Sequence, residues 1–111
     1  MADQPTPPRT GLHLYGRCEG LSARQWSTDT RSGIEHSLGI SFPFVNEFGM
    51  EQREIVKIAV GEKMLAHITQ QANTLKGKVV SLRVGIQARK GGATGAWLRY
   101  YVPNDADLVP A

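Results

Sequence analysis

The chain has 111 residues, of which 41% are hydrophobic, a formal net charge of +3 and a single cysteine. This length suits one small domain with its own core, and the hydrophobic content excludes an intrinsically disordered chain. Cys18 has no intramolecular disulfide partner, so we expect a cytoplasmic protein. We expect neither a signal peptide nor a membrane span, because no apolar run approaches the ~18 residues that cross a bilayer.

The charge is unevenly distributed along the chain. Residues 1–62 hold six Lys/Arg and eight Asp/Glu, whereas residues 63–104 hold seven Lys/Arg and no acid. Asp105 and Asp107 follow near the end. A long stretch of one sign predicts a basic surface, although part of it lies on a predicted helix.

The first half of the chain predicts three strands. Residues 1–10 contain three prolines and no periodicity, so we expect a disordered arm before a single domain at 11–111. The polar stretch 22–32 is expected to be a loop or a protruding hairpin tip, and 43–49 a second loop. Apolar residues alternate between these segments, which predicts strands at 11–21, 33–42 and 53–60.

Particular residues are expected in the core or on the outside of these strands. The apolar positions that we expect to face the core are Leu12, Leu14, Cys18, Ile34, Leu38, Ile40, Val56, Ile58 and Val60. Phe44 and Phe48 in the second loop are expected to plug the barrel end. Arg53 and Lys57 share the opposite face of the third strand, either as nucleic-acid contacts or as a solvated basic face.

The second half predicts a helix followed by a hairpin of two strands. Residues 62–75 have the helical period, and Gly77 stands at the usual C′ position. The stripe expected in the core consists of Met64, Leu65, Ile68, Ala72 and Leu75. Residues 78–87 and 96–102 alternate as strands around a glycine-rich turn. In these strands the residues expected to face inward are Val80, Leu82, Val84, Ile86, Ala96, Leu98, Tyr100 and Val102, and those expected to face outward are Ser81, Arg83, Gly85, Gln87, Trp97, Arg99 and Tyr101.

The order of three strands, a helix and two strands is that of the OB-fold. This predicts a mainly β protein, a five-stranded Greek-key barrel with one helix between strands 3 and 4. An SH3-like barrel is the main alternative, and it lacks a helix of this length.

No catalytic motif stands out. The three histidines lie in separate predicted elements, Cys18 has no CxxC context, and the glycines at 91–95 join two strands instead of preceding a helix. The carboxylates are scattered, so a metal-dependent nuclease lacks its acidic pair. We therefore expect no metal, no cofactor and no enzymatic activity.

The strongest functional signal is the outward face of the last strand. Trp97, Arg99 and Tyr101 alternate there, and Arg83 extends the same face from the neighbouring strand. Bases stack on exposed rings for about 1–3 kcal/mol each, while arginine contacts phosphates. The alternative is that these aromatic residues pack under a loop or form a dimer seam.

Two further clusters combine cations with flexible or aromatic positions. Arg89 and Lys90 at the last hairpin predict a phosphate clamp, with a solvated turn or a crossing to a partner subunit as alternatives. Around the first hairpin, a nucleic-acid-binding wing is predicted, and the alternative is that its tryptophan folds back onto the barrel. The residues of that wing are Arg17, Arg24, Trp26 and Arg31.

Four segments, in this order, resemble a known family. They are Thr30-Arg31-Ser32-Gly33, Ile55-Val56-Lys57-Ile58, Gly77 to Gly85, and Asp107-Leu108-Val109-Pro110-Ala111. The chain resembles the single-stranded DNA-binding proteins of filamentous bacteriophages, the gene V or helix-destabilising type. The resemblance implies an OB-fold, a twofold dimer using a hairpin at Arg89 to Gly95, a DNA-binding first hairpin, and cooperative coating of DNA during phage replication. The long helix and the arm depart from that family.

We therefore expect a sequence-tolerant single-stranded DNA-binding homodimer, in the host cytoplasm if phage-encoded, with RNA left open as a ligand. The alternative is a protein-interaction OB or SH3-like barrel that seats a partner protein on Trp97 and Tyr101. The residues expected to bind nucleic acid are Tyr15, Arg17, Arg24, Trp26, Arg31, Arg53, Lys57, Arg83, Arg89, Lys90, Trp97, Arg99 and Tyr101.

Overall fold

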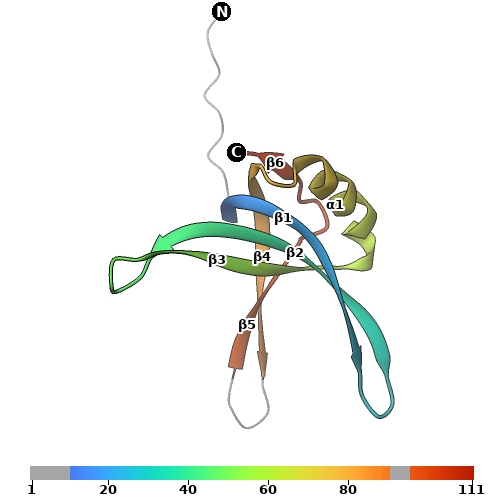
Figure 1. Cartoon of the computed structure of the whole chain (residues 1–111). Coiled ribbons are helices and arrows are strands. Elements are labelled where there is room, and N and C mark those ends of the chain that lie inside the picture. Colours follow the sequence, from blue (N-terminus) through green and yellow to red (C-terminus); the bar gives the residue numbers. More distant parts are fainter. Residues whose placement is uncertain (1–10, 91–95) are drawn as a thin grey trace, which may run out of the picture.

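A computed structural model describes residues 11–90 and 96–111, with only the backbone described at 89, 90, 96 and 97. Its elements are β1 (Leu12–Ser27), β2 (Ser32–Val45), β3 (Glu51–Val60), α1 (Glu62–Leu75), β4 (Val79–Lys90), β5 (Ala96–Tyr101) and β6 (Leu108–Pro110). The strand order is β1-β2-β3-β5-β4-β6, and a pairing of β1 with β4 closes the barrel (Figure 1). The β3–β5 pair is parallel and the other pairs are antiparallel. This confirms the predicted mainly β, OB-fold-like barrel with its helix between β3 and β4.

Strand β1 closes the barrel because it pairs with two different neighbours. Its first part pairs with β4, and from Arg17 onward it pairs with β2. Gly16 stands at the change of partner, where a Cβ atom would lie 2.5 Å from the backbone oxygen of Ser41. A β-bulge between Cys18 and Gly20 then bends the strand further.

The core lies between the barrel and α1. The helix begins and ends where the sequence predicted, and it buries Met64, Ile68, Ala72 and Leu75. The strands contribute the predicted Cys18, Leu38, Ile40, Ile58, Val60, Val80, Leu82, Val84 and Val102. Burial raises the pKa of the Cys18 thiol, which marks it as a core residue. Gly77 has a φ of +84° after the helix, which confirms the predicted C′ glycine.

The expected loops at 22–32 and 43–49 are shorter than predicted. Strands β1 and β2 continue as a hairpin beyond the barrel, with a turn closed by the hydrogen bond from the Thr28 amide to the Arg31 carbonyl. For residues 22–32, the alternative of a protruding hairpin is therefore confirmed and the alternative of a loop is wrong. Polar residues form strands here because each backbone group finds a partner across the hairpin. Likewise, β2 extends through Val45.

Several residues expected in the core lie outside it. Ile34 and Leu98 are 62% and 63% exposed, and Ile86 is also exposed, because their strands project past the barrel as two arms (Figure 1). Leu12, at the first position of β1, is exposed as well. Phe48 is 78% exposed at the tip of the β2–β3 hairpin, so the prediction that it plugs the barrel is wrong. Phe44, half-buried on the same hairpin, is also absent from the core cluster.

The C-terminal segment adds a strand that the sequence did not predict. β6 pairs with β4, and Ser81, which was expected to face outward, is buried beside it. Asp107 accepts hydrogen bonds from His67 Nε2 at 2.6 Å and Gln71 Nε2 at 3.3 Å, and these lower the pKa of its carboxyl. The segment is thus fastened to α1. Among the described residues, no helix is long and apolar enough to cross a membrane.

We predict that Gly16→Ala lowers the free energy of unfolding by about 1–3 kcal/mol, because the added methyl group must push β1 away from β2. Urea denaturation measures this change. Gly61→Ser is the matched control, since no atom lies within 4 Å of a Cβ there and the change at this N-cap position is only a few tenths of a kcal/mol. A Gly16→Ala protein as stable as the original would contradict the close approach.

Candidate nucleic-acid interface

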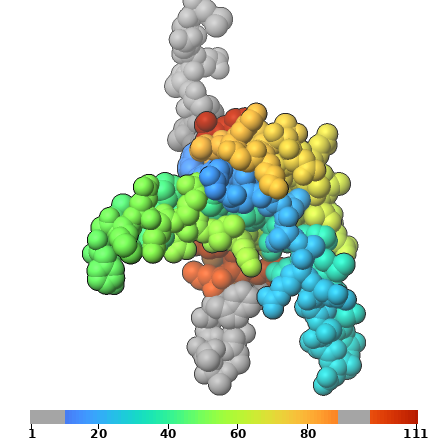
Figure 2. Space-filling view, viewed as in Figure 1, coloured from blue at the N-terminus to red at the C-terminus, as the bar shows by residue number. Residues whose placement is uncertain are grey.

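The strand register brings one face of β1, β2, β3 and β5 together on the outside of the barrel. Arg24 pairs with Glu35, Ser37 with Ala59, and Ala59 with Tyr101. Directly opposed residues in a sheet share a face, so these positions lie on one continuous surface. Figure 2 shows the β1–β2 and β2–β3 hairpins projecting from the body of the molecule in different directions.

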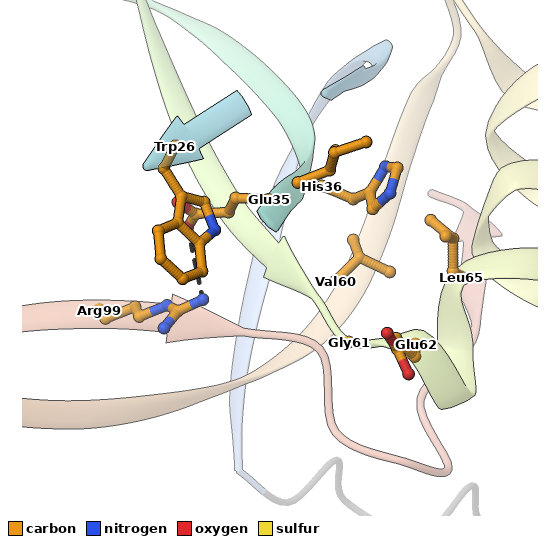
Figure 3. A pocket seen from close by; sticks show the side chains of 9 residues that line it. Trp26, Glu35, His36, Val60, Gly61, Glu62, Leu65 and Arg99 are labelled. Atoms are coloured by element: carbon orange, nitrogen blue, oxygen red, sulfur yellow. Dashed lines mark hydrogen bonds and ion pairs between the residues drawn. The ribbon is translucent and has the colours of Figure 1, made fainter. Parts of the chain in front are cut away.

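Two hollows lie on this side of the molecule. The smaller, about 140 Å³, is lined by Ser22, Arg24, Glu35, Ser37, Lys57, Ala59, Arg99 and Tyr100. The larger, about 700 Å³, is lined by Trp26, Ile34, Glu35, His36, Val60, Gly61, Glu62, Leu65 and Arg99 (Figure 3). Because both are lined by Glu35 and Arg99, the hollows adjoin, and together we call them the outer groove.

An ion pair stands where the two hollows meet. Arg99 Nη2 on β5 lies 3.4 Å from Glu35 Oε1 on β2, so the contact joins two separate arms of the fold. Figure 3 draws the pair beside Trp26 at the edge of the larger hollow. Both side chains keep substantial exposure, so the ion pair is weak and can open when a stronger anion is present.

The aromatic rings of this face rest on glycines. A Cβ at Gly33 would lie 2.9 Å from Trp26 Cζ2, and one at Gly85 would lie 2.2 Å from Tyr101 Cζ. The missing side chains let each ring lie across the neighbouring strand, as aromatic residues often do opposite a glycine. Trp26 and Tyr101 nevertheless remain 40% and 39% exposed. Trp26 therefore packs on its own hairpin and does not fold back onto the barrel core.

The exposed cations of the face differ in how they are held. Within residues 11–90 and 96–111, no acidic side chain forms an ion pair with Arg24 or Lys57. Both line the smaller hollow. Cations in this state can exchange water and counterions for phosphate without breaking a protein contact.

Arg17 and Arg53 instead belong to a polar network farther along the sheet. Arg17 Nε donates to Glu19 Oε1 at 2.6 Å, Ser41 Oγ donates to the same oxygen at 2.6 Å, and Arg53 Nε donates to Ser41 Oγ at 3.1 Å. The hydrogen bond from Ser41, followed by that from Arg17, lowers the pKa of the Glu19 carboxyl. The two arginines are thus partly neutralised by Glu19.

Not every expected site residue lies on the outer groove. Arg83 pairs with Asp105 and lines a separate hollow with His13 and residues of the C-terminal segment. Tyr15 is exposed on the part of β1 that pairs with β4. Arg31 is exposed next to the β1–β2 turn. The alternation of the sequence indicated the outside of the barrel correctly for Arg83, but it could not indicate which side.

The residues of the last hairpin are described in backbone only. Arg89 pairs with Trp97 and Lys90 with Ala96. The interpretation of their side chains lies outside the described residues, as does the glycine turn. Sequence reasoning missed Glu35, because nothing in a single sequence indicated its pairing with Arg99 across the barrel. Among the described residues, no group of three or more His, Cys, Asp or Glu could hold a metal ion.

Comparisons with known proteins support the fold. Among solved structures, a Plasmodium falciparum SSB in complex with ssDNA is similar to this chain, with a TM-score of 0.50 and 11% sequence identity over 97% of this chain and 99% of that chain. At this identity the similarity shows the OB-fold-like architecture alone. Known protein families and curated protein sequences yield no match.

We predict that Gly33→Ala displaces the Trp26 ring, because the new methyl group would stand 2.9 Å from it. In a Trp97→Phe background, acrylamide quenching of the remaining tryptophan should increase as the ring swings into solvent. Gly61→Ala in the same background is the control, since a Cβ there meets nothing within 4 Å. Equal quenching in the Gly33→Ala protein and its parent would show that the ring does not rest on Gly33.

Proposed function

We propose that this chain is a non-enzymatic, sequence-tolerant single-stranded DNA-binding protein that uses the outer groove. The observation that carries the proposal is the exposed Trp26 ring beside Arg24, Lys57 and Arg99 on one hollowed sheet face. In OB-folds, the face of strands 2 and 3 and the loops at 1–2 and 4–5 bind oligonucleotides. The similar Plasmodium SSB, solved with ssDNA, supports this by analogy of fold.

The charges suggest how a strand would lie in the groove. Phosphates would contact Arg24 and Lys57, which form no ion pair with any described residue. Arg99 would also contact a phosphate once its ion pair with Glu35 opens. Bases would stack on Trp26, which lines the groove, and on Tyr101, which lies outside its lining on the same sheet face. Both rings are already held against glycines and so lose little freedom on binding. Stacking uses the faces of the bases, which explains why we expect little sequence preference and a preference for single strands over duplex.

The remaining expected contacts extend this proposal. Arg17 and Arg53 would lengthen the basic track along β1 and β3 once the strand competes with Glu19. Other contacts proposed from the sequence are Tyr15, Arg31, Arg83, Arg89, Lys90 and Trp97. Of these, Arg83 is the least favoured, because it pairs with Asp105 away from the groove.

The resemblance to filamentous-phage proteins supports a finer proposal. A phage-type protein would act as a twofold homodimer of the domain at 11–111 and coat replicating DNA in the host cytoplasm. The order of the four resembling segments supports this assignment. A different class, a protein-binding barrel, is favoured by the exposed Ile34 and Leu98 on the two arms.

We predict that tryptophan fluorescence is quenched by oligo-dT at low salt, and that affinity falls steeply as salt rises because bound counterions are released. Trp26→Ala should weaken binding by about 1–3 kcal/mol through the lost stacking. Lys57→Ala should reduce the salt dependence by about one counterion. Lys63→Ala, on the exposed side of α1, is the matched control and should leave both quantities unchanged.

Two results would count against the proposal. An absence of oligo-dT binding at low salt would favour the protein-binding barrel. Equal affinity for a duplex of the same length would indicate a general electrostatic binder with no use for the exposed rings.

We also predict that Glu35→Gln strengthens oligo-dT binding several-fold. The substitution removes the carboxylate from the groove and frees Arg99 for phosphate. Filter binding or fluorescence anisotropy at fixed salt measures the change. Glu54→Gln removes the same charge from the opposite face of β3 and should have a smaller effect. Weaker binding by Glu35→Gln would mean that the Glu35–Arg99 ion pair shapes the groove for its ligand.

A further inference from the structure

The tip of the β2–β3 hairpin exposes apolar side chains that no part of the chain covers among the described residues. Val45, Phe48 and Met50 are all largely exposed there, with Phe48 at 78%. Glu47 lies among them and Glu51 follows them, and residues 44–52 contain no Lys or Arg. We call residues 45–51 the acidic tip. Figure 1 shows it at the far end of the β2–β3 hairpin, away from α1.

The acidic tip has a defined shape. Asn46 Oδ1 accepts hydrogen bonds from the amides of Phe48 and Met50 at 3.0 and 2.9 Å, and the Asn46 amide donates to the Met50 carbonyl at 2.9 Å. Gly49 supplies the φ of +77° that the turn requires. The hydrogen bonds hold Phe48 outward at the apex. An aromatic side chain presented by an ordered turn is a binding element with little entropy left to lose.

The charges of the tip indicate what it can bind. Glu47 and Glu51 repel the phosphates of nucleic acids and of anionic lipids, so the apolar cluster suits a cationic, partly apolar surface. The smaller hollow of the outer groove is cationic, because Arg24, Lys57 and Arg99 line it together with a single acid, Glu35. Among the described residues, neither Arg24 nor Lys57 forms an ion pair. The adjoining larger hollow supplies the apolar side chains of Trp26, Ile34 and Leu65, beside Glu35 and Glu62.

A tip cannot reach the groove of its own chain. Tip and groove are joined by the continuous strand β3, whose ten residues span about 33 Å at the usual rise of a strand. Bending β3 back would break its pairing with β2 along that whole length. The groove that receives a tip therefore belongs to a second copy.

We propose that, in the absence of nucleic acid, the acidic tip of one copy docks in the outer groove of another. Phe48 enters the larger hollow, and Glu47 and Glu51 pair with Arg24 and Lys57. Each copy offers one tip and one groove, so the contact is head-to-tail and builds open chains. Nucleic acid competes for the same groove and disperses them. This choice of receptor rests on the groove assigned under the proposed function.

Sedimentation velocity of the full chain at low salt tests the contact without nucleic acid. We expect the average mass to rise with concentration beyond a dimer, and to fall with added salt or with dT6, an oligonucleotide of about one OB-fold site. Phe48→Ser should weaken the association about tenfold or more, because it removes the aromatic anchor. Val109→Ser, an exposed apolar residue on β6, is the control and should leave it unchanged.

A charge exchange identifies the two surfaces. Glu47→Lys/Glu51→Lys and Arg24→Glu/Lys57→Glu should each abolish chain formation, and an equimolar mixture of the two variants should restore it as alternating chains. Glu54→Lys, on the opposite face of β3, is the charge control. The proposal would be overturned if the Phe48→Ser protein and the Glu47→Lys/Glu51→Lys protein each self-associated as strongly as the original chain. It would also be overturned if the equimolar mixture of the two charge variants stayed dispersed.

The outcome is separable from that for the proposed function. Tip-dependent chains in a protein that does not bind dT6 would support the contact between tip and groove, and would contradict both the competition by nucleic acid and the proposed function. Binding of dT6 by a protein whose average mass does not depend on concentration would support the proposed function and contradict the contact between copies.

Discussion

The whole molecule depends on β1 pairing with two neighbours. The strand leaves β4 and joins β2 at Arg17, and at the preceding Gly16 a side chain would collide with the Ser41 backbone. This change of partner closes the barrel, and it also sends the rest of β1 outward with β2 as a hairpin. The same hairpin then carries Arg24, Trp26 and Glu35 to the side where Arg99 approaches from β5. The core and the candidate site thus follow from one close backbone approach.

The outer groove combines features that are costly on an ordinary surface. Exposed rings cost solvation, and their support by Gly33 and Gly85 removes side chains that would otherwise stiffen the strands. Arg24 and Lys57 face solvent without an acid partner among the described residues, while Arg99 forms a partly exposed ion pair with Glu35. A ligand with alternating planar and anionic groups would cover the exposed rings and neutralise these cations at the same time. In the proposed contact between copies, the ring of Phe48 and the carboxylates of Glu47 and Glu51 from the acidic tip take the place of such a ligand.

The sequence predicted what depends on local periodicity and failed where long-range pairing decides. Helix α1 was predicted to the residue, because its apolar stripe and Gly77 are local signals. The length of the β1–β2 hairpin was not predicted, because the polar residues there form strands only by pairing with each other. The alternation of the sequence predicted that Arg83 and Arg99 both lie on the outside of the barrel. In the closed barrel, however, they line two different hollows. The Glu35–Arg99 contact spans 64 positions, and no local pattern indicates it.

The outer groove is the proposed site of a single DNA strand. Backbone amide chemical-shift mapping of the isotope-labelled protein during titration with dT6 tests this most directly, because it locates the ligand without changing the chain. We expect the largest shifts at Arg24, Trp26, Lys57 and Arg99, with little change at His67 and Asp107 on the far side. Shifts concentrated around Arg83 and Asp105, or none at all at saturating dT6, would contradict the account.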